Sequence, residues 1–225
     1  MEKILSEMVV AVNHDFFLKD PLSSDLGKKI VQQSPALITE LGMECFNFKK
    51  LSERVGSTEA AIYRYFENKH KLLLYLTSWY WGWLEHHLVY GTNNLKDPLD
   101  KMKTVIGLLV EGPTYRESEY VNLNNLRTLV TEESYKSFLT KEVDIENKNG
   151  YFRQFYRFMD RIAGIIIEIN PNYKYPKTLV SILVETTLLQ AFFLKHMPKM
   201  TEPTLQGEEK LNFYYRLAIQ TIKDE

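Results

Sequence analysis

The sequence predicts an all-α protein. Apolar residues recur every three to four positions in nearly every long segment, and no segment keeps the strict alternation of a β-strand. Breaks at Gly112-Pro113, at Asn170-Pro171 and across residues 198–207 separate several of these helical segments. With 225 residues and 44% hydrophobic content, the chain is large enough for a packed core. We therefore expect a small helical unit followed by a longer helical body.

Composition and charge exclude several classes of protein. The net charge of −1 argues against a uniformly basic coat for nucleic acids. The only cysteine, Cys45, cannot form an intramolecular disulfide, which fits a reducing compartment. The start of the chain lacks a secretory signal pattern, and the runs at 106–110 and 164–167 are too short to span a bilayer. We expect a cytoplasmic protein without membrane contact.

An amphipathic extension is expected over residues 1–22. Its apolar positions recur at helical spacing ahead of the breaker Asp20-Pro21, and its polar face is not rich in Lys or Arg. A helix that packs on the body is therefore favoured over a membrane-surface helix. The positions are Ile4, Leu5, Met8, Val9, Val12 and Phe16.

Three short helices are expected over residues 23–70. Ser24, Asn47 and Thr58 precede them, and each has a side-chain oxygen that can cap a helix N-terminus. Gly42 and Gly56 end the first two helices, because glycine adopts left-handed dihedrals without a Cβ penalty. The second and third helices span 48–55 and 59–66, and the first contains a proline that should kink it. A long fourth helix, capped by Asn68, follows.

Two short helices that meet at Gly56 form a helix-turn-helix, whose second helix enters the DNA major groove. The motif and the start of the helix after it contain, in order, Gly56, Ile62-Tyr63, Tyr65-Phe66, Asn68-Lys69 and Leu72-Leu73. This residue order resembles the TetR family of bacterial transcriptional regulators over about the first third of the chain. Pro35 departs from the family pattern. The resemblance implies a helix-turn-helix DNA-binding domain over 23–70 and an effector-binding and dimerisation domain over 71–225.

The outward face of the motif supplies the candidate DNA contacts. Leu51, Val55, Ile62 and Phe66 fall on the inward faces and should fix the angle between the helices. Small alanines let the third helix approach the groove, and tyrosine hydroxyls and lysines suit phosphate oxygens. The candidates are Asn47, Lys49, Thr58, Glu59, Ala60, Ala61, Tyr63, Arg64, Tyr65 and Lys69.

Two of these candidates have open roles. Glu59 could accept a hydrogen bond from a cytosine amino group, or could simply complement the helix dipole. Arg64 could bind a guanine in a bidentate manner, or could pair with a phosphate.

The body offers candidates for an effector pocket and for a dimer interface. An aromatic cluster would suit an apolar effector, although aromatic stripes at helical spacing are more often core. Its members are Trp79, Tyr80, Trp83, Phe152, Phe155, Tyr156 and Met159. The helix near 175–197 is apolar on all sides, so one face could pack on its own body and another, with the last helix, on a partner. The interface candidates are Leu179, Ile182, Leu183, Thr186, Gln190, Phe193, Tyr214 and Ala218.

No constellation in the sequence indicates catalysis, a metal or a cofactor. His86 and His87 are adjacent on a helix and point apart, and no H-x-x-x-H, C-x-x-C or glycine-rich phosphate loop occurs. The favoured function is a homodimeric transcriptional regulator, a repressor that binds a palindromic double-stranded DNA operator and an unknown small-molecule effector. The alternative is a helical interaction scaffold of the same fold that has lost DNA or effector binding. An enzyme is not indicated.

Overall fold

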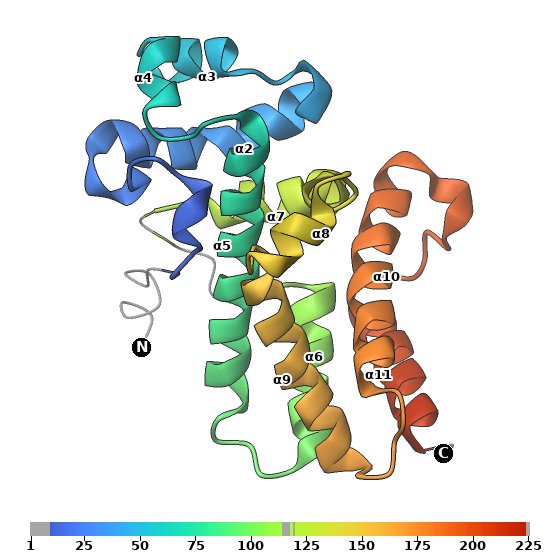
Figure 1. Ribbon diagram of the computed structural model, residues 1–225. Helices are drawn as coiled ribbons and strands as arrows, with labels where there is room; N and C mark the ends of the chain where they lie inside the picture. Colours follow the sequence, from blue (N-terminus) through green and yellow to red (C-terminus); the bar gives the residue numbers. More distant parts are fainter. Residues whose placement is uncertain (1–9, 114–117, 119, 224–225) are drawn as a thin grey trace. The chain divides into compact units, whose positions relative to one another are not determined.

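The structure is a computed structural model that describes residues 10–113, 118 and 120–223. All regular secondary structure among these residues is helical, which confirms the predicted class (Figure 1). The chain forms two compact units, one within Met1–Gly82 and Tyr115–Gln154 and the other within Trp83–Thr114 and Phe155–Glu225. Residues 71–82 and the segment that ends at Gln154 thus group by contacts with the N-terminal unit.

The N-terminal unit is built around α2, which packs against α3 and α7. Its elements are η1 (His14–Phe16), η2 (Pro21–Ser23), α2 (Asp25–Cys45), α3 (Phe48–Val55), α4 (Glu59–Tyr63), the first part of α5 (Lys69–Thr92), α7 (Leu123–Glu133), η3 (Ser134–Ser137) and α8 (Val143–Lys148). The third helix of the motif is thus shorter than the expected 59–66. Tyr65 and Phe66 still donate their backbone N–H groups to the carbonyl of Ile62.

The predicted helix starts are confirmed in detail. The Ser24 hydroxyl accepts from the backbone N–H of Gly27 at 3.3 Å, and the Asn47 side chain accepts from that of Lys50 at 2.9 Å. Thr58 Oγ1 accepts from the N–H of Ala61 at 3.2 Å. Asn68 caps α5 in the same way through the N–H of Lys71 at 2.9 Å. Each cap satisfies a backbone donor that the helix itself leaves unpaired.

Gly42 interrupts α2 as expected, whereas Pro35 does not. Gly42 has φ +74°, and it is the residue inside α2 with non-helical dihedrals. Pro35 is buried and keeps helical dihedrals within α2. The chain therefore bends at residue 42, three residues before the helix ends.

The N-terminal extension differs from the predicted helix in its described part. Residues 10–13 are not helical, and His14–Phe16 form a single 3-10 turn. Of the predicted positions in this part, Phe16 is buried and Val12 is half-buried, and Val10, which was not among them, is also buried. The predicted positions Ile4 to Val9 lie outside the described residues.

The second unit packs α6 against α10 and α11, which lie side by side in Figure 1. Its elements are the last part of α5, α6 (Pro98–Val110), most of α9 (Arg153–Ile169), α10 (Pro176–His196), η4 (Pro198–Met200) and α11 (Gly207–Lys223). Among the described helices, α10 has the length and composition to cross a membrane, but one such helix is weak evidence. Val180, Leu183 and Val184 of α10 are buried inside the unit, although only 33% of its apolar window is buried.

Candidate nucleic-acid interface

The turn between α3 and α4 is set by Gly56. This residue has φ +70° and ψ +44°, the left-handed conformation that L side chains avoid. The turn is closed by the N–H of Ser57, which donates to the carbonyl of Ser52 at 2.9 Å. Leu51, Ile62 and Phe66 are completely buried and Val55 nearly so, which confirms the inward face of the motif.

The opposite face of the motif is open to solvent. Ala60 and Arg64 are exposed, and Glu59 and Ala61 are half-buried at the start of α4. Tyr63 is 47% exposed, with one edge of its ring packed against Phe48 at a centroid distance of 4.9 Å. This contact restrains the ring while nearly half of the residue stays exposed. Asn47, Lys49 and Thr58 are also exposed.

Tyr65 does not belong to this face. Its side chain is only 5% exposed, and its hydroxyl shares a 2.8 Å hydrogen bond with the Ser24 hydroxyl at the start of α2. Its backbone carbonyl accepts from the N–H of Leu18 at 2.8 Å. The structure thus places Tyr65, a predicted DNA contact, inside the unit, where it anchors α4 to the chain that precedes α2.

Lys69 also departs from its expected role as a phosphate ligand. Its ammonium donates to the carbonyl oxygens of Met43 at 2.6 Å, Glu44 at 3.2 Å and Phe46 at 3.2 Å. Lys50 donates to the remaining carbonyl, that of Cys45, at 2.9 Å. The last carbonyls of a helix lack partners and carry partial negative charge, so two lysines cap the C-terminus of α2.

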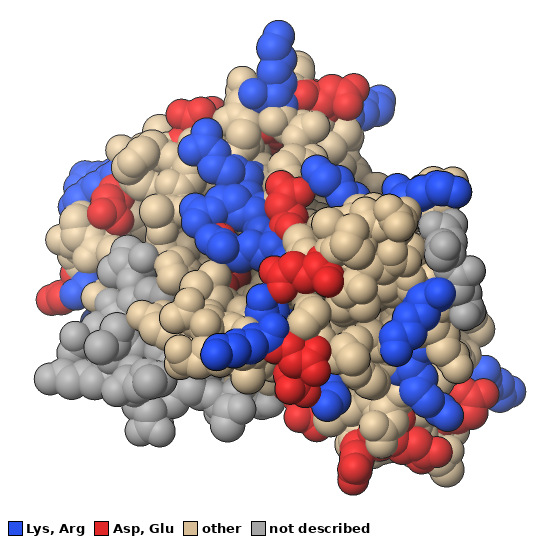
Figure 2. Space-filling model, turned by 90° about the horizontal axis from the view of Figure 1, so that it is seen from below, with Lys and Arg blue, Asp and Glu red and all other residues tan. Residues whose placement is uncertain are grey.

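The capping lysines reduce the number of cations that can reach a phosphate. Arg54 is paired with Glu40 at 2.5 Å, and Lys71 donates to the Tyr151 hydroxyl at 2.5 Å. Lys49 and Arg64 keep exposed side chains, which leaves them as the strongest charged candidates in the motif. In the face shown in Figure 2, several Lys and Arg side chains lie beside Asp and Glu side chains, and others stand apart from them.

A cluster that the sequence did not indicate stabilises the bend in α2. The carboxylate of Glu133, at the end of α7, accepts from the backbone N–H of Met43 at 3.2 Å and is 7% exposed. Lys136 lies 2.8 Å from Glu133 and 2.7 Å from Glu44. The hydrogen bond from Lys136 holds the pKa of Glu44 below its usual value. We call Glu133, Lys136, Met43 and Glu44 the α2 clasp.

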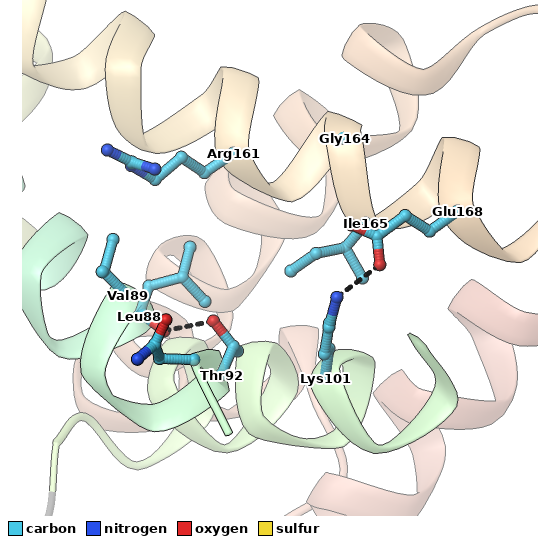
Figure 3. Close-up of a pocket in the computed structure, with 9 residues that line it drawn as sticks. Leu88, Val89, Thr92, Lys101, Arg161, Gly164, Ile165 and Glu168 are labelled. Atoms are coloured by element: carbon cyan, nitrogen blue, oxygen red, sulfur yellow. Dashed lines mark hydrogen bonds and ion pairs between the residues drawn. The ribbon is translucent and has the colours of Figure 1, made fainter. Parts of the chain in front are cut away.

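The residues predicted to form an effector pocket do not line the cavity described below. Trp79, Tyr80 and Trp83 are buried core residues, and Phe152, Phe155 and Met159 are half-buried. Tyr156 is 47% exposed. A cavity of about 300 Å³ lies instead among the end of α5, the start of α6 and the second half of α9 (Figure 3). None of the seven predicted residues lines it.

The eight predicted interface residues divide into two groups. Leu179, Leu183, Tyr214 and Ala218 are buried within the unit, so they hold α10 and α11 to their own body. Ile182 is 48% exposed, and Thr186, Gln190 and Phe193 continue along its side of α10 with partial exposure. On α11 the exposed apolar residues are Phe213 and Leu217.

No group of three or more His, Cys, Asp or Glu side chains within the described residues could hold a metal ion. Cys45 is exposed at the end of α2.

The comparisons with known proteins agree with this geometry. A family model described as "Bacterial regulatory proteins, tetR family" matches residues 30–76. Three solved structures share the fold. AibR in complex with isovaleryl coenzyme A and operator DNA aligns with a TM-score of 0.57 and 11% identity, covering 84% of this chain and 97% of that chain.

The ketosteroid transcriptional regulator KstR2 of Mycobacterium tuberculosis aligns with a TM-score of 0.55 and 11% identity, over 89% of this chain and 94% of its own. The superantigen PfiT aligns with a TM-score of 0.59 and 14% identity, over 88% and 97%. At such identities the likeness shows the fold alone. The comparison with curated proteins finds no match.

Proposed function

We propose that this chain, which belongs to the TetR family of bacterial regulatory proteins, is a sequence-specific DNA-binding repressor. The proposal rests mainly on the solvent-exposed face of α4. Ala60, Tyr63 and Arg64 project from a short helix whose other face is fixed in the core by Ile62. Small and hydrogen-bonding side chains on such a helix can reach base edges in a major groove.

Homodimerisation is part of the same proposal. Ile182 and Phe213 expose apolar surface on neighbouring helices, which is typical of a surface that a partner covers. A two-fold dimer presents two equivalent α4 helices, so the operator would be a palindrome. An Ile182→Glu variant should be monomeric by light scattering and keep the helical content of the wild-type protein. A wild-type protein that is monomeric at micromolar concentration would contradict this interface.

An effector is supported by the solved relatives. AibR was crystallised with both isovaleryl coenzyme A and operator DNA, and KstR2 is described as a ketosteroid transcriptional regulator. We propose that a small molecule bound in the second unit favours a spacing of the two α4 helices that no longer fits successive major grooves. We propose that the protein acts in the cytoplasm.

Selection from a random pool of duplex DNA tests the central claim. Wild-type protein should enrich a palindromic motif, and Arg64→Ala should relax the preference at one base pair per half-site if Arg64 reads a guanine. The affinity loss would then be about 1–3 kcal/mol. An unchanged motif with uniformly weaker binding would make Arg64 a phosphate contact. If the wild-type protein enriches no sequence, the helical scaffold becomes the better explanation.

A further inference from the structure

The cavity in the second unit has one apolar side and a polar rim. Leu88, Val89 and Ile165 supply methyl groups, and Arg161, Lys101 and Glu168 supply charge. In Figure 3 Leu88 and Val89 lie nearer to the Arg161 guanidinium, whereas Ile165 lies nearer to the Lys101–Glu168 pair. A volume of about 300 Å³ is at the lower end of the range of small-molecule sites. The cavity therefore suits a small amphipathic ligand.

A buried carboxylate fixes the orientation of Arg161. Glu85 is 2% exposed, and one of its oxygens accepts from Arg161 Nε at 2.6 Å and lies 3.1 Å from Arg157 Nη2. Arg161 is thus held by its Nε, and within the described part of the chain its Nη groups make no hydrogen bond or ion pair. A planar pair of N–H donors that is already oriented matches the two oxygens of a carboxylate.

The charges around the cavity favour anion binding at the end where Arg161 lies. Lys101 is paired with Glu168 at 2.5 Å, so the net charge at their end of the cavity is close to zero. An anion placed there would also be repelled by the Glu168 carboxylate. At the other end Arg157 and Arg161 share the single negative charge of Glu85. An excess of one positive charge matches a monoanion better than a phosphate dianion. Leu88 and Val89 lie beside that end and can cover a short apolar chain.

We propose that this cavity binds a small carboxylic acid, with the carboxylate on the Nη groups of Arg161 and the hydrocarbon chain over Leu88, Val89 and Ile165. The role of this acid as the effector rests on the proposed function, but its binding does not. Neither the aromatic cluster nor the α4 surface takes part in the site.

Gly164 provides a way to close the cavity without damaging the fold. It lines the cavity, and a Cβ added to it would meet no atom within 4 Å. Leucine is also a better helix former than glycine, so Gly164→Leu should fold at least as well as the wild type. Lys177→Gln is a matched charge control, because Lys177 pairs with Asp160 at 3.0 Å in the same unit and does not line the cavity.

The experiment uses hexanoate and benzoate as probes and the corresponding neutral amides as controls. Calorimetric titration gives the affinity, and methyl-labelled protein observed by NMR locates the binding through Leu88, Val89 and Ile165. Wild type and Lys177→Gln should bind at least one acid with shifts confined to these methyl groups. Arg161→Gln should weaken the acid about tenfold or more, to the level of the amide, and Gly164→Leu should abolish binding.

Three outcomes would overturn the proposal: no binding of either acid at millimolar concentration, equal binding of acid and amide by the wild type, or unchanged binding by Gly164→Leu. Inorganic phosphate serves as a further probe, and tighter binding of phosphate than of both acids would also overturn it. DNA selection with Gly164→Leu separates the two claims. Enrichment of the wild-type motif by this variant would leave the proposed function intact whatever the cavity binds.

Discussion

Replacing Lys69 by methionine separates a lysine that caps a helix from a lysine that binds DNA. The substitution keeps the length of the side chain and removes the donors to the carbonyls of Met43, Glu44 and Phe46. A hydrogen bond to a charged group contributes about 1.5–3 kcal/mol, but one half-exposed ammonium shares these three acceptors. The short bond to Met43 should dominate, so we expect a loss of about 2 kcal/mol in the free energy of unfolding. For a chain of this size the melting temperature would fall by about 4–8 °C.

Lys49→Met is the matched control. Lys49 is exposed in the same motif, and within the described residues its ammonium makes no contact. Its removal should leave stability unchanged, lower the affinity for all DNA sequences alike, and reduce the magnitude of the salt slope by about 1.

Urea unfolding measures the stability of each variant, and DNA binding at several salt concentrations measures its salt slope. The capping assignment predicts that Lys69→Met shifts the urea midpoint and leaves the salt slope as in the wild type. If Lys69→Met instead unfolds at the wild-type urea concentration and loses about 1 in the slope, Lys69 binds a phosphate and the assignment to α2 is refuted.

Three further variants test the fold. Gly56→Ala should cost about 1–2 kcal/mol in unfolding experiments, because φ is +70° while its Cβ would meet nothing. Gly27→Ala should cost more, because the added Cβ would lie 2.1 Å from the carbonyl oxygen of Pro21 and the backbone would have to move. Burial, helped by the charge of His86, lowers the pKa of His87 from 6.5 to about 4. The unfolded chain therefore binds a proton that the folded chain does not, so stability should fall as the pH drops from about 6.5 to about 4. His87→Gln should flatten that part of the curve of unfolding free energy against pH.

Local signals in the sequence were sufficient for the motif itself. A cap such as Thr58 and a left-handed turn at Gly56 depend on atoms within a few residues, so their chemistry can be recognised from the order of residues. The same holds for the inward face, because Leu51 and Ile62 follow the helical period.

The surroundings that the sequence did not reveal involve partners that are distant along the chain. Tyr65 was predicted to face outward, but Ser24 approaches it from 41 residues away. Lys69 has the chemistry of a phosphate ligand, yet the carbonyl end of α2 lies within its reach. The cavity combines Leu88, Lys101 and Arg161 from three helices, and no spacing in the sequence brings these residues together.

The contact between Glu133 and the backbone N–H of Met43 provides a natural reporter in the α2 clasp. The Met43 amide proton is buried next to the bend at Gly42. Its rate of hydrogen exchange therefore reports whether α7 and the helix-turn-helix unit stay in contact. If DNA binding and effector binding are coupled through this junction, linkage requires each ligand to alter the junction in opposite directions. Operator DNA should then slow hydrogen exchange at Met43, and the effector should accelerate it. The exchange rate of this one proton would thus follow the allosteric equilibrium.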